Sequence, residues 1–160
     1  MDQKTDKKGA AVRFPPPLVF LLAILLSFLL HRFLPLSLPF GNWLSYLGGA
    51  ILFASILLLA NLFFAFRRAK THIEPWKPTS HIITTGVFAY SRNPIYLAFC
   101  LITVGIALLV NSVWVFVSMF PSAYLIYLIA IKKEEAYLAA KFGQEYLDYK
   151  ESVSRWLSLF

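Results

Sequence analysis

Charged residues are scarce in this chain and are missing from two long stretches. Asp, Glu, Lys and Arg make up 14% of its 160 residues, against roughly 25% in a typical soluble domain. None of them occurs from Trp43 to Phe66 or from Asn93 to Ile131. Uncharged apolar stretches of about 18 residues or more are typical of membrane-spanning helices. Because so short a chain cannot cover such segments with its own polar surface, the sequence predicts an integral membrane protein.

Other absences exclude several kinds of site. The single cysteine, Cys100, lies in an apolar run and cannot form an intrachain disulfide, so we expect it to pack in a core. No G-x-G-x-x-G pattern follows a candidate strand, which excludes a soluble Rossmann cofactor site. His72 and His81 have no third ligand at a suitable spacing, so no metal site is expected.

The apolar stretches predict an all-α, single-domain membrane protein (residues 1–160) with four transmembrane helices. As one helix, the uncharged block 93–131 would be about 58 Å long, nearly twice the thickness of the hydrocarbon core. It must therefore fold back, and the polar pair Asn111-Ser112 at its midpoint predicts a tight hairpin. Pro121 is expected to kink the last helix. The predicted spans are 17–36, 43–66, 94–111 and 112–131.

The distribution of basic residues predicts the orientation of these spans. With four spans, the N-terminal segment, the loop 67–93 and the tail 132–160 share one side and carry fourteen of the fifteen Lys and Arg residues. Only Arg32 falls on the other side, so the positive-inside rule makes the rich side cytoplasmic. The net charge of +7 thus indicates contact with a membrane surface rather than with nucleic acid. No small-residue cleavage site follows the first span, which we expect to be retained.

The loop 67–93 is too long for a simple connector between neighbouring helices. Pro75 and Pro78 forbid a continuous helix through its first half, and Gly86 favours a turn. Pro94 suits the first turn of the next span. Long ordered loops often carry function, so this loop is a candidate site.

The tail predicts two short amphipathic helices. Leu138 and Phe142 share one helix face, and Gly143 is a good terminator. Beyond it, the spacing of Tyr146, Tyr149 and Val153 places them on one side of a second helix. A helix lying on lipid headgroups would explain this pattern. It would not explain the adjacent carboxylates of Glu134 and Glu135 at a surface that is usually anionic.

Two motifs resemble the isoprenylcysteine carboxyl methyltransferase family, within the wider group that includes phospholipid N-methyltransferases. Residues 85–96 read TGVFAYSRNPIY, similar to the family's Gly, aromatic residue and Arg-His-Pro-x-Tyr at the start of a helix. Residues 134–149 contain Glu-Glu, then Phe-Gly, then Glu-Tyr-x-x-Tyr, similar to the family's tail. The resemblance as a whole covers about residues 80–155, half of the chain.

The resemblance implies a membrane methyltransferase that uses S-adenosylmethionine and acts on a lipophilic small molecule or lipidated acceptor. It implies no catalytic residue. By position in the motifs, the family's cofactor contacts fall on Ser80, His81, Ile82, Ile83, Phe88, Asn93, Pro94, Ile95, Tyr96 and Glu134. Three positions depart from the pattern: Asn93 replaces a His, Phe88 replaces a Tyr, and Ala130 stands where the family has an Arg that contacts prenylcysteine.

The chemistry of these residues fits such a cofactor. Arg92 has a planar fork of donors that can hold a carboxylate. Glu134 or Glu135 can face the ammonium or the ribose hydroxyls. Aromatic side chains can surround the adenine and the sulfonium; the candidates are Trp76, Phe88, Tyr90 and Tyr96.

Purely structural explanations of the same residues stay open. Arg-Asn-Pro can be only a positive-inside anchor and a helix start, the two glutamates can be a solvated face paired with Lys132, Lys133 or Lys141, and the tyrosines can be an interfacial anchor. Two other functions also remain. A steroid- or sterol-type membrane reductase that uses NADPH has a similar Arg-x-Pro-x-Tyr stretch, and a non-enzymatic membrane subunit would bind no small molecule. The sequence does not specify the acceptor or the oligomeric state.

Overall fold

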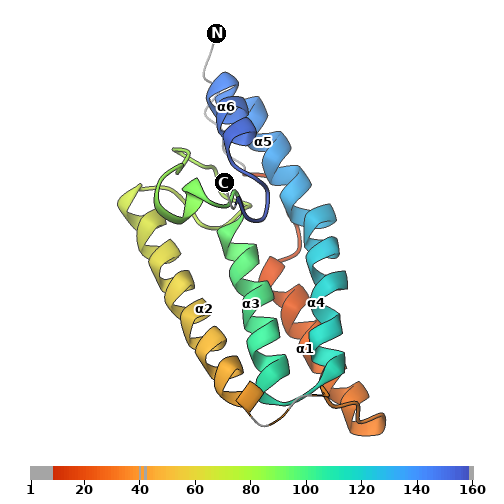
Figure 1. Cartoon of the computed structure of the whole chain (residues 1–160). Coiled ribbons are helices and arrows are strands. Elements are labelled where there is room, and N and C mark those ends of the chain that lie inside the picture. The colour runs from red at the N-terminus through yellow and green to blue at the C-terminus, as the bar shows by residue number, and fades with distance from the viewer. Residues whose placement is uncertain (1–8, 40, 42, 159–160) are drawn as a thin grey trace. The chain divides into compact units, whose positions relative to one another are not determined.

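The computed structural model describes residues 9–39, 41 and 43–158, and every regular element in this part of the chain is a helix. The expectation of an all-α protein is confirmed to that extent. Lys4, Lys7, Lys8 and the last two residues of the tail lie outside the described residues. The helices (Figure 1) are α1 (Pro16–Phe33), α2 (Trp43–Arg68), the 3-10 helix η1 (Gly86–Ala89), α3 (Pro94–Leu109), α4 (Val113–Ile126), the π-helix η2 (Tyr127–Ile131), α5 (Lys132–Phe142) and α6 (Gln144–Ser152).

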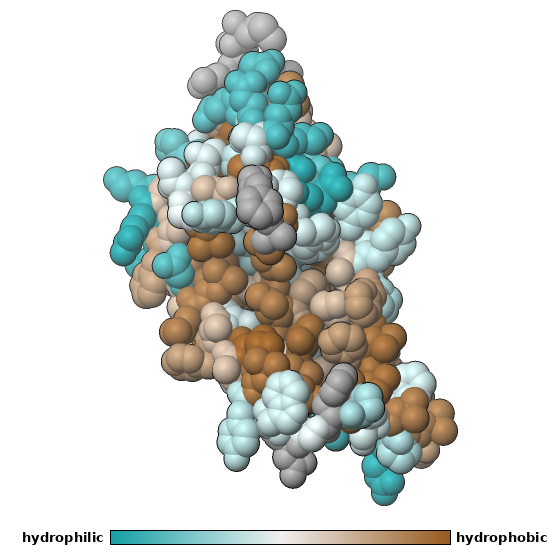
Figure 2. Space-filling model, viewed as in Figure 1, coloured by the Kyte–Doolittle hydropathy of each residue, from teal (hydrophilic) through white to brown (hydrophobic). Residues whose placement is uncertain are grey.

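Among the described residues, three helical segments are long and apolar enough to cross a membrane: Pro16–Phe33, Trp43–Arg68 and Val113–Phe142. The last of these joins α4, η2 and α5 end to end. Helix α3 is equally apolar but has only 16 residues. Many large apolar side chains of α1 and α2 are exposed, and Figure 2 shows hydrophobic residues gathered over the region of α1 to α4. Such a surface suits lipid rather than water.

The chain divides into two compact units. One, which we name the bundle unit, comprises Pro15–Ala60 and Ile95–Ile126. Within it α1 packs along α4, and Ile24, Ala107 and Val115 form a buried core. The unit thus contains α1, α3, α4 and α2 as far as Ala60, and the four spans stay a prediction.

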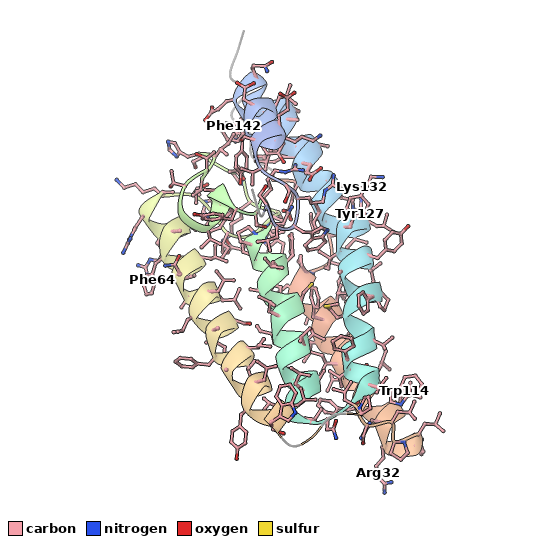
Figure 3. The ribbon with its side chains drawn as sticks, viewed as in Figure 1. Arg32, Phe64, Trp114, Tyr127, Lys132 and Phe142 are labelled. Atoms are coloured by element: carbon pink, nitrogen blue, oxygen red, sulfur yellow. The ribbon has the colours of Figure 1, made fainter. Side chains whose placement is uncertain are left out.

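Polar side chains join two connections of the bundle unit. Asn111 and Ser112 lie between α3 and α4, and Asn111 has the left-handed backbone (φ 50°) that asparagine tolerates well. The backbone N–H of Leu38 donates to Asn111 Oδ1 at 3.0 Å. Ser112 Oγ lies 3.1 Å from His31 Nδ1. In Figure 3, Arg32 at the end of α1 points away from the helices.

The other unit, which we name the loop–tail unit, comprises Asn61–Pro94, Tyr127–Phe160 and the described part of Met1–Phe14. As Pro75 and Pro78 predicted, no α-helix occurs between α2 and α3, and Gly86 adopts a positive φ of 64°. The N-terminal segment lies against this loop, because Gly9 N–H donates to Trp76 O at 3.2 Å. Both segments that carry the family resemblance therefore fall within one unit, apart from Ile95 and Tyr96.

Candidate functional site

Helices α5 and α6 carry the second motif of the candidate site. Gly143 ends α5 with φ 57° and ψ −127°, a backbone conformation that side chains with a Cβ rarely adopt. The chain then turns into α6, which buries Tyr146 and Tyr149. These two tyrosines and Val153 form a buried cluster, as their spacing predicted. The partly buried residues packed against the cluster are Ile82, Leu138, Ala139 and Phe142.

The loop 86–93 is fastened to the tail by hydrogen bonds. Tyr149 donates its hydroxyl to Phe88 O at 2.7 Å. Beyond α6, the backbone N–H of Arg92 donates to Ser154 O at 3.1 Å, and the N–H of Ser158 donates to Tyr90 O at 2.7 Å. The Asn93 side-chain amide donates to Arg155 O at 3.1 Å. The loop and the tail, about 60 residues apart in sequence, are thus joined by several hydrogen bonds to backbone atoms.

A buried ionic cluster lies where the loop, α5 and the tail meet. Arg92 Nη1 donates to Glu135 Oε1 at 2.9 Å. Arg155 grips the same carboxylate with two nitrogens, Nε to Oε1 at 2.8 Å and Nη2 to Oε2 at 3.0 Å. The Arg92 and Glu135 side chains are only 7% and 12% exposed, and that of Arg155 is 33% exposed. We name these three residues the arginine–glutamate cluster; its charged hydrogen bonds are of the strong kind.

Aromatic side chains border the cluster. The Arg155 guanidinium carbon lies 4.8 Å from the centre of the Tyr127 ring, a cation–π distance. The hydrogen bond with Glu135 raises the pKa of Arg155. Burial raises the pKa of Tyr146 although a hydrogen bond with Arg92 acts in the opposite sense, so this phenol is neutral at physiological pH. Although burial acts to raise the pKa of Glu135, its hydrogen bond with Arg155 lowers it, so Glu135 and Arg155 both stay charged at physiological pH.

The expected cofactor-binding residues are distributed unevenly over this site. Phe88, Asn93 and Pro94 are buried, Ile82 packs against the tail, and Ile83 is half-buried. Ser80 and His81 are exposed, although the Ser80 backbone N–H donates to Thr71 Oγ1 at 2.9 Å. Ile95 and Tyr96 belong to the bundle unit, where Tyr96 is 6% exposed. Glu134 is half-buried, and its charge acts on Tyr146.

The four aromatic residues considered for a ring slot differ in burial. Phe88 is buried, and its ring meets Phe66 edge to face with centres 5.7 Å apart. Tyr96 is also buried, whereas Trp76 and Tyr90 are 45% and 63% exposed. Trp76 and Tyr90 are thus the weaker candidates to enclose an apolar ring.

Sequence reasoning did not anticipate the roles of Glu135, Arg155 and Tyr127 in one cluster. It assigned the cofactor contact to Glu134, offered Glu135 only as a chemical alternative, and used Arg155 only in counting basic residues. The signal was weak because Arg155 lies 20 residues beyond Glu135 and across two helix ends. Tyr127 lies in η2, a π-helical segment that no periodicity in the sequence marked.

Comparisons with known proteins find one family and several relatives to which the chain is similar. A sequence profile described as phospholipid methyltransferase matches residues 43–145. The chain is 27% identical over 114 residues to the protein-S-isoprenylcysteine O-methyltransferase of Xenopus laevis and 28% identical over 114 residues to that of Homo sapiens. It is 33% identical over 82 residues to the protein of the same name from Saccharomyces cerevisiae.

The matched regions cover a larger share of this chain than of its relatives. For the Xenopus and human proteins they take in 70% of this chain but 40% of the relative. For the yeast protein they take in 51% of this chain and 34% of the relative. The chain thus spans well under two thirds of the length of the curated relatives that it matches.

Proposed function

Because the chain belongs to the phospholipid methyltransferase family, we propose that it is an integral membrane methyltransferase that uses S-adenosylmethionine and acts on a lipophilic acceptor. The observation that carries this proposal is the contact between Arg92 and Glu135 at 2.9 Å. It joins the motif before α3 to the motif after η2 within one unit. The two segments needed to close around a single ligand are therefore neighbours.

The donor set of this unit suits the proposed cofactor. Arg92 Nε is buried and makes no hydrogen bond within the described part of the chain. A buried N–H without an acceptor is costly, so this atom is suited to a ligand carboxylate. The amino-acid carboxylate of S-adenosylmethionine is such a group. When bound, the cofactor supplies a methyl group activated by its positive sulfonium.

The acidic residue that would face the cations of the cofactor is Glu134. The assignment follows from the position of Glu134 in the family motif, and the neighbouring Glu135 accepts hydrogen bonds from Arg92 and Arg155. Glu134 lies in the first turn of the same helix and is half-buried. Phe88, Asn93 and Pro94 would supply the apolar and aromatic walls, and Ser80–Ile83 the more exposed rim.

Transfer of a methyl group to a bound acceptor needs little acid–base chemistry from the protein. A carboxylate acceptor is already a nucleophile, and an amine acceptor needs only to be neutral. The residues of the chain would align the two reactants and exclude water, which are the main contributions a protein makes to an in-line displacement. The neutral, buried Tyr146 is consistent with a site that moves no proton.

We further propose four spans, with the loop 67–93 and the tail 132–160 on the cytoplasmic side. Helix α3, about 24 Å long at 16 residues, would cross a locally thinned bilayer or extend its span through the residues at its ends. A lipophilic acceptor could then enter from the bilayer while the cofactor enters from water. Since Ala130 is uncharged and fully buried, we propose the lipophilic class and not prenylcysteine in particular.

Ligand binding tests the proposed function directly. Purified protein in detergent is titrated with S-adenosylhomocysteine and, separately, with NADPH, by calorimetry and by thermal shift. We expect saturable binding of S-adenosylhomocysteine and none of NADPH. Binding of NADPH alone would support a reductase, and binding of neither ligand by folded protein would contradict an enzyme of either kind.

A substitution tests the assignment of Glu134. Glu134→Ala removes a charge that would face the ammonium or the ribose, and a hydrogen bond to a charged group is worth about tenfold or more in affinity. We expect S-adenosylhomocysteine binding to fall by at least about that factor while membrane insertion is unchanged. The matched control is Glu145→Ala, at an exposed position in the first turn of α6, which should bind as the wild type does. Unchanged affinity in Glu134→Ala would remove Glu134 from the site.

A further inference from the structure

We propose that Glu135 and Arg155 are positioning residues that orient the Arg92 guanidinium toward the cofactor carboxylate. This inference rests on the proposed function, since it assigns Arg92 a ligand. It also makes a statement about the protein alone: the direction of the Arg92 side chain depends on a residue of the C-terminal segment, 63 positions further along the chain.

The Arg92 side chain is buried and forms a hydrogen bond with Glu135. It is 7% exposed, and Nη1 donates to Glu135 Oε1 at 2.9 Å. Its Nε is the buried atom that lacks an acceptor among the described residues. Because the guanidinium is planar and rigid, fixing one Nη fixes the direction in which the Nε–H points. Glu135, together with Tyr146, which also forms a hydrogen bond with Arg92, thereby orients the atom at which Arg92 would receive an anion.

Both oxygens of the Glu135 carboxylate accept hydrogen bonds from Arg155. A carboxylate on a helix can rotate about its side-chain bonds unless both oxygens are held. Arg155 binds Oε1 through Nε at 2.8 Å and Oε2 through Nη2 at 3.0 Å, a two-point grip that fixes the carboxylate plane. Lysine could make only a point contact there.

Arg155 itself is supported by contacts of its side chain and its backbone. Its guanidinium stacks over Tyr127, with 4.8 Å from Cζ to the ring centre. Its backbone carbonyl accepts from the Asn93 side chain at 3.1 Å, and the preceding residue, Ser154, accepts from the Arg92 backbone at 3.1 Å. The segment 153–158 therefore runs beside the loop that carries Arg92. In Figure 3, the labelled Tyr127 lies in the helical run that continues into Lys132.

Positioning explains features that stability alone would not require. Buried ion pairs contribute little net stability, since desolvation opposes the attraction. Catalytic and binding groups, by contrast, have to be held in place by a supporting layer of hydrogen bonds. The orientation of a functional arginine by a second arginine through one shared carboxylate is an arrangement of this kind.

The test uses Arg155→Lys, which keeps the charge and loses the two-point grip. We expect the affinity for S-adenosylhomocysteine to fall about tenfold, the value of one charged hydrogen bond. In an Arg92→Ala background the same Arg155→Lys change should cause no further loss, because the residue through which it acts is gone. Lys150→Ala, at an exposed position of α6, is the control and should leave affinity unchanged. An equal loss in both backgrounds would overturn the proposal.

A second readout requires no ligand. In protein labelled with ¹⁵N-arginine, the Arg92 Nε–H resonance is assigned by its disappearance in Arg92→Ala, and its exchange with water is measured by NMR. We expect slow exchange in the wild type and faster exchange in Arg155→Lys, with the melting temperature nearly unchanged. Equal exchange in the two proteins would refute positioning even if the wild type binds S-adenosylhomocysteine. If the wild type failed to bind it while exchange differed as expected, the proposed function would fail and the orienting role of Arg155 would stand.

Discussion

Tyr149 shows how one side chain secures the candidate site. The residue is 8% exposed and gives its hydroxyl to Phe88 O at 2.7 Å, across 61 positions of sequence. Burial raises its pKa, so the hydroxyl stays a donor at any physiological pH. The aromatic ring fills the cluster around Tyr146 while the hydroxyl holds the loop. Apolar packing and a polar contact thus come from the same residue.

Tyr149→Phe is predicted to loosen the loop without emptying the cluster. The ring is kept, but the buried carbonyl of Phe88 loses its donor, which costs about 1–2 kcal/mol. We expect a lower melting temperature in detergent and faster proteolysis of the loop 67–93. Tyr90→Phe is the control, since the Tyr90 side chain is 63% exposed, and it should melt with the wild type. A Tyr149→Phe protein with wild-type melting would show that this hydrogen bond contributes nothing.

Among the helices, α2 and α3 approach each other where both carry glycine. A Cβ at Gly48 would lie 2.8 Å from Gly105 O and from Leu108 Cβ, and one at Gly105 would lie 3.0 Å from Gly48 O. Small residues allow this close approach, which gives dispersion contacts that replace the hydrophobic effect inside a bilayer. The sequence contains the two glycines, but only the structure pairs them.

Gly48→Ala and Gly49→Ala should therefore differ although the residues are adjacent. The first places a methyl group in contact with the backbone of α3, so the helices must separate, at a cost of about 1–3 kcal/mol. The second meets only Leu109 Cδ2, at 3.9 Å, an ordinary contact. We expect a lower melting temperature for Gly48→Ala alone, measured in the same detergent. Equal effects of the two substitutions would contradict this packing.

The π-helical segment η2 is the element that sequence periodicity missed. It occupies Tyr127–Ile131 between α4 and α5, so one helical run from Val113 to Phe142 contains a local change of pitch. Such segments are frequent at functional sites because they alter which residues share a face. Here the segment carries Tyr127, which stacks on Arg155, and leads directly into the helix with Glu135.

At the scale of the whole molecule, the distribution of charge makes a topological prediction. Four spans would place the basic loop and tail on the cytoplasmic side and Arg32 on the other. Single cysteines are introduced at Lys77, Lys150 or Arg32 in a Cys100→Ala background, because Cys100 is the only native cysteine. We expect a membrane-impermeant maleimide to label the Lys77 and Lys150 positions only in inside-out vesicles.

The same reagent should label the Arg32 position only from the outside of intact cells. All three native residues have exposed side chains or partly exposed ones, so access is set by the membrane and not by the fold. Labelling of the Lys77 and Lys150 positions from opposite sides would mean an odd number of spans between them, and the four-span arrangement would be wrong.

Much of the architecture could be predicted because it follows from local composition. The apolar helices, the irregular loop with Pro75 and Pro78, the break at Asn111-Ser112 and the glycine that ends α5 all depend on residues close together in sequence. The tyrosine face of α6 was also predicted, since its spacing is a property of one helix. The assignment of individual cofactor contacts stays a prediction.

By itself the sequence determined that this chain is helical and apolar enough for a membrane. The absence of charged residues can be recognised in each stretch without knowledge of its tertiary contacts. Only the tertiary structure decided that the Glu135 carboxylate accepts hydrogen bonds from both Arg92 and Arg155. Adjacent residues of a helix point about 100° apart, and the rotation of α5 depends on η2 and on packing against the tail. That rotation is set by contacts among residues that lie 20 to 63 positions apart in sequence, and no local sequence pattern shows such contacts.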